Sequence, residues 1–206
     1  MLKCKHISAY PSEYLSLFGH PKDGEGDTLR EFISAIERLS GPRGIGFRSD
    51  DDMHKFKGDC LEVLSELFFT RFNSDPAMGL AEYVPVKIED DFGVDAIGVN
   101  PNGDKSAVQV KYRSNPKDVV TYADVARTYS SGVKMLGIDP CKPRTIFVFT
   151  TAQDVSFQCK KVFGDSLVII NRNILARAIN NNRNFWRLSY EEVREYVSFH
   201  AGSYSI

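Results

Sequence analysis

Hydrophobic periodicity divides the chain into a helical first quarter and a longer region in which strands and helices alternate. Apolar residues recur at helical spacing over residues 27–39, where Thr28 and Glu31 form a capping-box pattern. A second helix is predicted over residues 54–72, and the acidic residues 50–52 before it suit the positive end of a helix. We therefore expect residues 1–52 to form a helical extension ahead of the main domain.

From about residue 80 the pattern changes to short apolar strands. Strands are predicted at 82–88, 94–99, 106–112, 144–151 and 166–170, and helices at 121–136, 152–163, 173–180 and 189–199. Pro85 predicts that the first of these is an edge strand or carries a bulge, and Ser189 with Glu192 forms a second capping box. This order predicts an α/β domain over residues 53–182 with a mixed sheet, antiparallel early and parallel late, followed by a packing helix in 183–206.

Polar side chains interrupt two neighbouring strands of this predicted sheet. Asp95 lies on the strand at 94–99, and Gln109, Lys111 and Arg113 follow on the next strand or just beyond it. Because side chains alternate along a strand, Gln109 and Lys111 share one face. Ionisable groups are costly at such positions, so these residues are candidates for a functional site.

The turn between the two strands decides whether Asp95 joins that face. A plain two-residue turn at Asn102 and Gly103 would set Asp95 opposite Val110, on the other face of the sheet. An odd-length loop or one bulge would shift the pairing by one residue and bring Asp95 to Gln109. A shared site therefore predicts an odd-length loop or a bulge.

On one face, these residues would suit metal-assisted hydrolysis of a phosphodiester. The Asp95 carboxylate, the Gln109 amide and the Val110 carbonyl offer the oxygen ligands that Mg²⁺ prefers, and Lys111 would neutralise charge on phosphorus. Glu62, on the helix at 54–72, would restore the charge lost with Gln in place of an acid. The alternatives are a turn cap for Asp95, an edge cation for Lys111, backbone pairing for Gln109, and a solvated Glu62 with Glu66 as its competitor.

The stretch "GVDAIGV…AVQVKYR" resembles the D-(x)n-QxK signature of the Mrr-like branch of the PD-(D/E)xK nucleases. "FKGDCLEVLSELF" resembles the first core helix of that family, with Glu62 at its acidic position. "IFVFTTAQDVSFQCKKV" and "LVIINRNILARAI" resemble later elements, although Asn171 and Arg172 replace the usual Asp-Gly. The resemblance covers roughly residues 56–180.

This resemblance implies a restriction-endonuclease-like α/β/α core and an endonuclease that hydrolyses DNA with Mg²⁺, or with Mn²⁺ as a substitute. It assigns catalysis to Asp95, Gln109, Lys111 and Glu62, and metal binding to Asp95, Gln109, Val110 and Glu62. A homodimer is implied as well, because cutting two strands needs two sites. The alternatives within the fold are a Holliday-junction resolvase and an inactive module that binds DNA or serves assembly; an RNA substrate is a further alternative.

Candidate DNA contacts follow the second polar strand. The net charge is −1, so binding to DNA would depend on a local basic surface. The candidates are Lys105, Tyr112, Arg113, Lys117, Thr151 and Gln153. For the cations the alternative is an ordinary solvated face, and for Thr151 it is the capping of the helix that follows.

The remaining composition narrows the setting of the protein. Four cysteines without a CxxC pair, and four histidines at no metal-ligand spacing, argue against a structural zinc site. Scattered cysteines without a signal peptide predict a reducing cytoplasm, that of a bacterium or of a phage-infected host. The longest apolar runs are too short for a membrane span, so no membrane association is expected.

Overall fold

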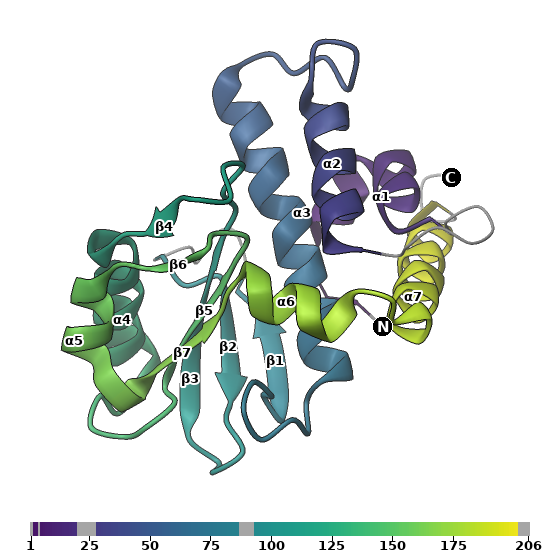
Figure 1. Cartoon of the computed structure of the whole chain (residues 1–206). Helices are drawn as coiled ribbons and strands as arrows, with labels where there is room; N and C mark the ends of the chain where they lie inside the picture. The colour runs from purple at the N-terminus through teal and green to yellow at the C-terminus, as the bar shows by residue number, and fades with distance from the viewer. Residues whose placement is uncertain (1, 4, 20–27, 87–92, 202–206) are drawn as a thin grey trace. The chain divides into compact units, whose positions relative to one another are not determined.

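The computed structural model describes residues 2, 3, 5–19, 28–86 and 93–201, which form two compact units (Figure 1). Unit 1 is drawn from residues 1–67 and 174–206, and unit 2 is residues 68–173. Both boundaries fall inside helices. The domain boundaries predicted at residues 52 and 182 stay a prediction.

The described part of unit 1 consists of helices. They are η1 (Lys5–Ala9), α1 (Pro11–Phe18), α2 (Leu29–Ser40), most of α3 (Asp50–Arg71), the end of α6 (Arg172–Ile179) and α7 (Arg183–Ala201). The predicted capping box of α2 is confirmed, because Thr28 Oγ1 accepts from Glu31 N at 3.2 Å and Glu31 Oε2 accepts from Thr28 N at 3.1 Å. Nowhere in the described ranges is a helix both long and apolar enough to cross a bilayer.

Aromatic side chains fill the core of unit 1. Phe56 is buried and contacts Tyr10 and Tyr14 edge-on, and Trp186 packs beside Phe32. The capping box predicted at Ser189 is wrong. The helix α7 already begins at Arg183, so Ser189 lies in its interior and donates to the carbonyl of Phe185 at 2.7 Å.

Unit 2 is built on a five-stranded sheet with the order β1-β2-β3-β5-β7. The strands are β1 (Glu82–Pro85), β2 (Ala96–Val99), β3 (Lys105–Lys111), β5 (Ile146–Thr150) and β7 (Leu167–Ile170). The pairs β1-β2 and β2-β3 are antiparallel, whereas β3-β5 and β5-β7 are parallel. The predicted mixed sheet is confirmed, and Pro85 lies on its edge strand; residues 87–88 of the predicted first strand lie outside the described residues.

Helices cover both faces of this sheet. Alternate residues of β5 point to opposite sides, so Ile146 and Val148 pack against α4 (Tyr122–Leu136) and α5 (Phe157–Phe163). On the other side Phe149 contacts Phe68, and Phe147 contacts Phe69, at the end of α3 (centroid distances 5.3 and 6.0 Å). The predicted α/β/α layering is therefore confirmed within unit 2.

A second, two-stranded sheet was not predicted. It pairs β4 (Val119–Val120) with β6 (Asp154–Val155) in parallel, and each strand is too short to show a period. The helix predicted over 152–163 therefore begins only at Phe157, after β6. Ser156 caps it by accepting from Cys159 N, so the alternative role of Thr151 as the helix cap is wrong. The short helix η3 (Gly164–Ser166) follows α5.

Candidate functional site

The loop between β2 and β3 brings Asp95 opposite Gln109. Ala96 pairs with Val108 and Val99 with Lys105. One residue before these pairs, the Asp95 side chain contacts the Gln109 amide. Asn100 N donates to Asp104 O at 2.9 Å, which closes a three-residue loop. Gly103 has a φ of +84°, the left-handed conformation that ends such a loop. The prediction of an odd-length loop is confirmed.

Hydrogen bonds from β3 hold the Asp95 carboxylate in place. Its Oδ2 accepts from the backbone N–H of Val110 at 2.5 Å and from the Gln109 amide nitrogen. The Asp95 backbone donates to Val108 O at 3.0 Å and accepts from Val86 N at 2.9 Å. Gln109 is only 3% exposed. Asp95 and Gln109 therefore form one ordered polar pair inside the sheet.

The Gln109 amide belongs to a buried hydrogen-bond network with Thr128 of α4. The hydroxyl of the buried Thr128 has a single hydrogen and lies within hydrogen-bond distance of three acceptors, which are Gln109 Oε1, Gly93 O at 2.7 Å and Asp124 O at 3.5 Å. The amide of Gln109 fits the same space when turned over. Its nitrogen would then donate to Thr128 Oγ1, and the Thr128 hydrogen would go to Gly93 O.

That second orientation points the Gln109 oxygen at the Asp95 carboxylate. Two oxygens in contact repel each other unless a proton or a cation lies between them. The Val110 carbonyl is close by, 3.4 Å from the Gln109 amide nitrogen. With the Gln109 amide turned over, Asp95, Gln109 and Val110 would offer a carboxylate, an amide and a carbonyl oxygen, a donor set that fits a hard divalent cation such as Mg²⁺.

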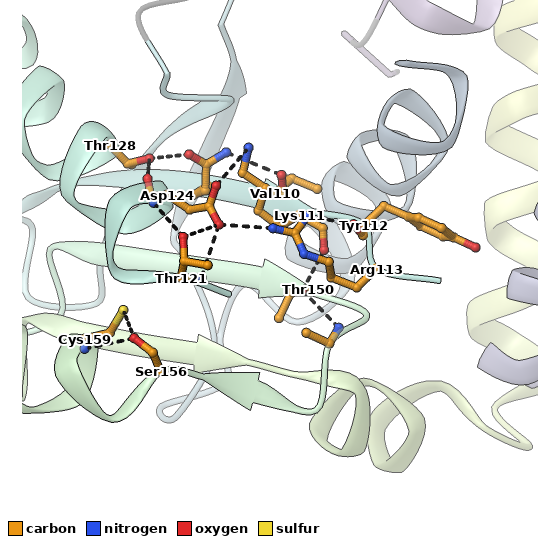
Figure 2. A network of polar contacts seen from close by, with 12 residues as sticks. Val110, Lys111, Tyr112, Arg113, Thr121, Asp124, Thr128, Thr150, Ser156 and Cys159 are labelled. Atoms are coloured by element: carbon orange, nitrogen blue, oxygen red, sulfur yellow. Dashed lines mark hydrogen bonds and ion pairs between the residues drawn. The ribbon is translucent and has the colours of Figure 1, made fainter. Parts of the chain in front are cut away.

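Lys111 and Arg113 converge on a carboxylate from α4, as Figure 2 shows. Asp124 Oδ2 accepts from Arg113 Nη2 at 3.0 Å, and Asp124 Oδ1 lies 4.0 Å from Lys111 Nζ. Asp124 also closes the capping box of α4 with Thr121. Burial by itself would raise the pKa of Asp124, but hydrogen bonds from Thr121 and the charges of Lys111 and Arg113 lower it further. Asp124 is therefore ionised at neutral pH.

Sequence reasoning missed Asp124 and Thr128. The one local feature that marks Asp124 is its capping-box spacing from Thr121, which indicates a helix start and says nothing about Lys111. Thr128 carries no such mark. Both are identified only by the packing of α4 on β3.

The segment after β3 is fixed by two threonines. Thr150 Oγ1 donates to Lys111 O at 2.6 Å (Figure 2). Thr151 Oγ1 accepts from Arg113 N at 2.7 Å and lies 2.9 Å from Arg113 O. Thr151 has no exposed surface, so its side chain offers DNA no contact in this conformation.

The other predicted DNA contacts are scattered. Lys117 and Gln153 are exposed, and Tyr112 is half-buried. Lys105 lies at the opposite end of β3 from Lys111, about 20 Å away at the rise of a strand, and donates to Leu136 O at 3.4 Å. The structure therefore brings Arg113 close to Lys111 and sets Lys105 apart from them.

Glu62 lies in unit 1, in a cluster with His6 and Asp59. His6 Nε2 lies 2.8 Å from Glu62 Oε2, and His6 Nδ1 lies 3.4 Å from Asp59 Oδ2. Burial lowers the pKa of His6, but its hydrogen bond to Glu62 and the charges of Glu62 and Asp59 raise it by more. Across the described part of the chain, these residues are the one group of three His, Cys, Asp or Glu side chains spaced to hold a metal ion. Each imidazole nitrogen faces its own carboxylate, as expected of a protonated histidine.

No protein-family model matches the chain, and no curated protein matches it significantly. Two solved structures align with it. The DNA modification-dependent restriction endonuclease AspBHI aligns over 79% of this chain and 45% of its own, at 14% identity and a TM-score of 0.36. The MspJI restriction endonuclease in complex with a 27-mer oligonucleotide aligns over 84% of this chain and 36% of its own, at 16% identity and a TM-score of 0.39. This chain spans less than half the length of either protein, and scores this low carry no argument about its function.

Proposed function

We propose that this chain is a metal-dependent endonuclease that hydrolyses phosphodiester bonds in DNA, with Asp95, Gln109 and Lys111 as its catalytic residues. The observation that carries the proposal is the odd-length β2-β3 loop, which puts Asp95 against Gln109 on the face that also carries Lys111. The resemblance of this stretch to the D-QxK signature supports the choice of reaction.

Three oxygen donors of unit 2 would hold the metal: Asp95 Oδ2, Gln109 Oε1 and Val110 O. In this reaction class a divalent cation makes an attacking water available near neutral pH and offsets charge on phosphorus. The Val110 N–H donates to Asp95 Oδ2 and fixes the direction of that carboxylate. Thr128 fixes the plane of the Gln109 amide from the other side.

Lys111 would bind the reacting phosphate. Its side chain is 31% exposed, so part of it lies at the surface, where a long amphipathic side chain commonly keeps its charged end. The 4.0 Å separation from Asp124 is longer than a hydrogen bond, so the ammonium hydrogens remain available to phosphate oxygens. Donors held toward a charge that grows in the transition state accelerate the step without reorganisation.

Cleavage assays test this proposal directly. The purified protein is incubated with supercoiled plasmid, linear duplex and four-way-junction DNA, each with Mg²⁺, Mn²⁺ or EDTA. Lys111→Ala and Asp95→Ala are compared with Lys117→Ala, which removes an exposed lysine that is a candidate DNA contact and not a proposed catalytic residue. We expect cleavage that needs the metal and falls about 10²–10³-fold in the first two variants only.

The substrate panel also separates the alternatives. Cutting confined to the four-way junction would favour a resolvase, and metal-independent binding without cutting would favour an inactive DNA-binding module. Absence of metal-dependent cleavage on every substrate, or equal cleavage by Asp95→Ala and the wild type, would overturn the proposed function.

A further inference from the structure

The helix α4 and the strand β3 pack in matching steps. A rise of four residues along a helix is about 6 Å, and two residues along a strand cover about 6.6 Å. Side chains one helical turn apart on α4 therefore fall beside residues that share one face of β3. Gln109 and Lys111 are such a pair on the strand, and Thr128 and Asp124 are such a pair on the helix.

The contacts follow this match at three successive levels. A Cβ added at Gly132 would lie 3.2 Å from Ala107 Cβ, so the glycine lets the helix approach the strand closely. One turn earlier, Thr128 contacts Gln109. One turn earlier again, Asp124 lies at Lys111. Each residue of the Gln-x-Lys pair therefore has its own partner on α4.

We propose that Asp124 and Thr128 are positioning residues for catalysis, with Asp124 holding the Lys111 ammonium and Thr128 holding the Gln109 amide. The inference rests on the proposed function of Gln109 and Lys111. Neither α4 residue would touch the DNA or the metal.

Asp124 has two tasks that must be separated. As a helix cap its Oδ2 accepts from Thr121 N at 3.1 Å and from Thr121 Oγ1 at 2.9 Å. The same oxygen accepts from Arg113, which leaves Oδ1 facing Lys111. The capping task needs an acceptor oxygen, whereas holding two cations side by side needs the negative charge.

Two substitutions separate these tasks. Asp124→Asn keeps an acceptor for Thr121 and removes the charge, and Asp124→Glu keeps both the charge and a residue suited to a capping box. Under saturating Mg²⁺ we expect Asp124→Asn to lower kcat about tenfold with KM unchanged or reduced, because one negative charge leaves the DNA-facing surface. Asp124→Glu should recover most of kcat, and the melting temperatures of both variants should stay within a few degrees of the wild type.

A second pair of substitutions tests the role of the Thr128 hydroxyl. Thr128→Val keeps the shape and removes the hydroxyl, and Thr128→Ser keeps the hydroxyl. We expect a loss of kcat in Thr128→Val and recovery in Thr128→Ser. Equal kcat in Asp124→Asn, Thr128→Val and the wild type would overturn the inference, as would losses that only follow the melting temperature.

A second readout does not depend on activity. The order parameter of the Lys111 ε-methylene, measured by ¹³C relaxation, should fall in Asp124→Asn and recover in Asp124→Glu. If the wild type cleaves no DNA, the proposed function fails, and this order parameter still decides whether Asp124 holds Lys111. An unchanged order parameter in Asp124→Asn would show that it does not.

Discussion

The molecule contains two polar clusters that differ in how their charges are balanced. In unit 2, the Asp95 carboxylate is met by a backbone N–H and a side-chain amide, and a half-exposed lysine lies on the same face. In unit 1, the His6 imidazole lies between the carboxylates of Asp59 and Glu62. The Val110 N–H and the Gln109 amide are neutral donors to Asp95, whereas a protonated histidine offsets much of the charge of its two partners.

This difference teaches that a count of carboxylates is a poor guide to a metal site. The His6 cluster has more acidic groups, but each imidazole nitrogen is directed at one of them, and Lys55 bonds both oxygens of Asp59 at 2.9 Å. Among the described residues, the Asp95 carboxylate has oxygen donors beside it and a cation suited to phosphate on the same face. We therefore place the proposed chemistry on Asp95 and interpret the His6 cluster as an ion-paired contact between η1 and α3.

The largest expected effect separates Asp95 from Glu62. Asp95→Asn should lower metal-dependent cleavage by about 10³-fold and abolish the rise in melting temperature on addition of Mg²⁺. Glu62→Gln should leave both largely intact. Cleavage assays and thermal melts with and without Mg²⁺ compare the two variants. An equal loss of cleavage in Glu62→Gln would instead support the catalytic role that the family resemblance implies for Glu62.

Lys111 gives the next largest effect. Lys111→Met keeps the apolar stem and should reduce the cleavage rate about 10²–10³-fold with little change in DNA affinity. Lys117→Met should weaken DNA binding slightly and lower its salt dependence by about one counterion if Lys117 contacts a phosphate. Single-turnover rates and binding at several salt concentrations distinguish the two, and similar behaviour of both variants would remove the special role of Lys111.

Gln109 offers a test of the donor set by stability rather than rate. Gln109→Glu puts a second carboxylate against Asp95, so we expect a loss of about 1–3 kcal/mol of stability without metal. Mg²⁺ should restore that stability, which makes the metal-induced rise in melting temperature larger than in the wild type. Gln153→Glu, at an exposed position, is the matched control. A rise no larger than that of the wild type would argue against a cation at Gln109.

The smallest expected effect lies in the His6 cluster. Because the pKa of His6 is raised in the folded state, its contribution to stability is fully present below the unfolded pKa, near 6.5, and is lost as pH rises through the folded pKa. His6→Gln should therefore cost about 1–2 kcal/mol at pH 6 and less at pH 9. Urea unfolding at both values measures this, with the exposed His54→Gln as control. A cost independent of pH would contradict the ion-pair interpretation.

The layered fold could be predicted from the order of helices and strands in the sequence. The shared face of Gln109 and Lys111 could be predicted as well, because alternation along a strand is a local property. The sequence did not decide which face of the sheet Asp95 lies on. That face depends on the length of the β2-β3 loop, which ends at the left-handed residue Gly103. Asp124 and Thr128 could not be predicted from the sequence, because they contact β3 only through the packing of a helix on a strand. The error at Ser189 has a similar source, because a capping-box pattern also fits the interior of a helix that begins earlier.

The most direct test of the central claim is where a divalent metal binds. Substoichiometric Mn²⁺ is titrated into ¹⁵N-labelled protein, and the loss of amide signals by paramagnetic relaxation is mapped along the chain. The account predicts that signals around Asp95 and Val110 disappear first, and that Asp95→Asn abolishes this loss. Broadening centred on Asp59 and Glu62 instead, or no selective broadening, would contradict it.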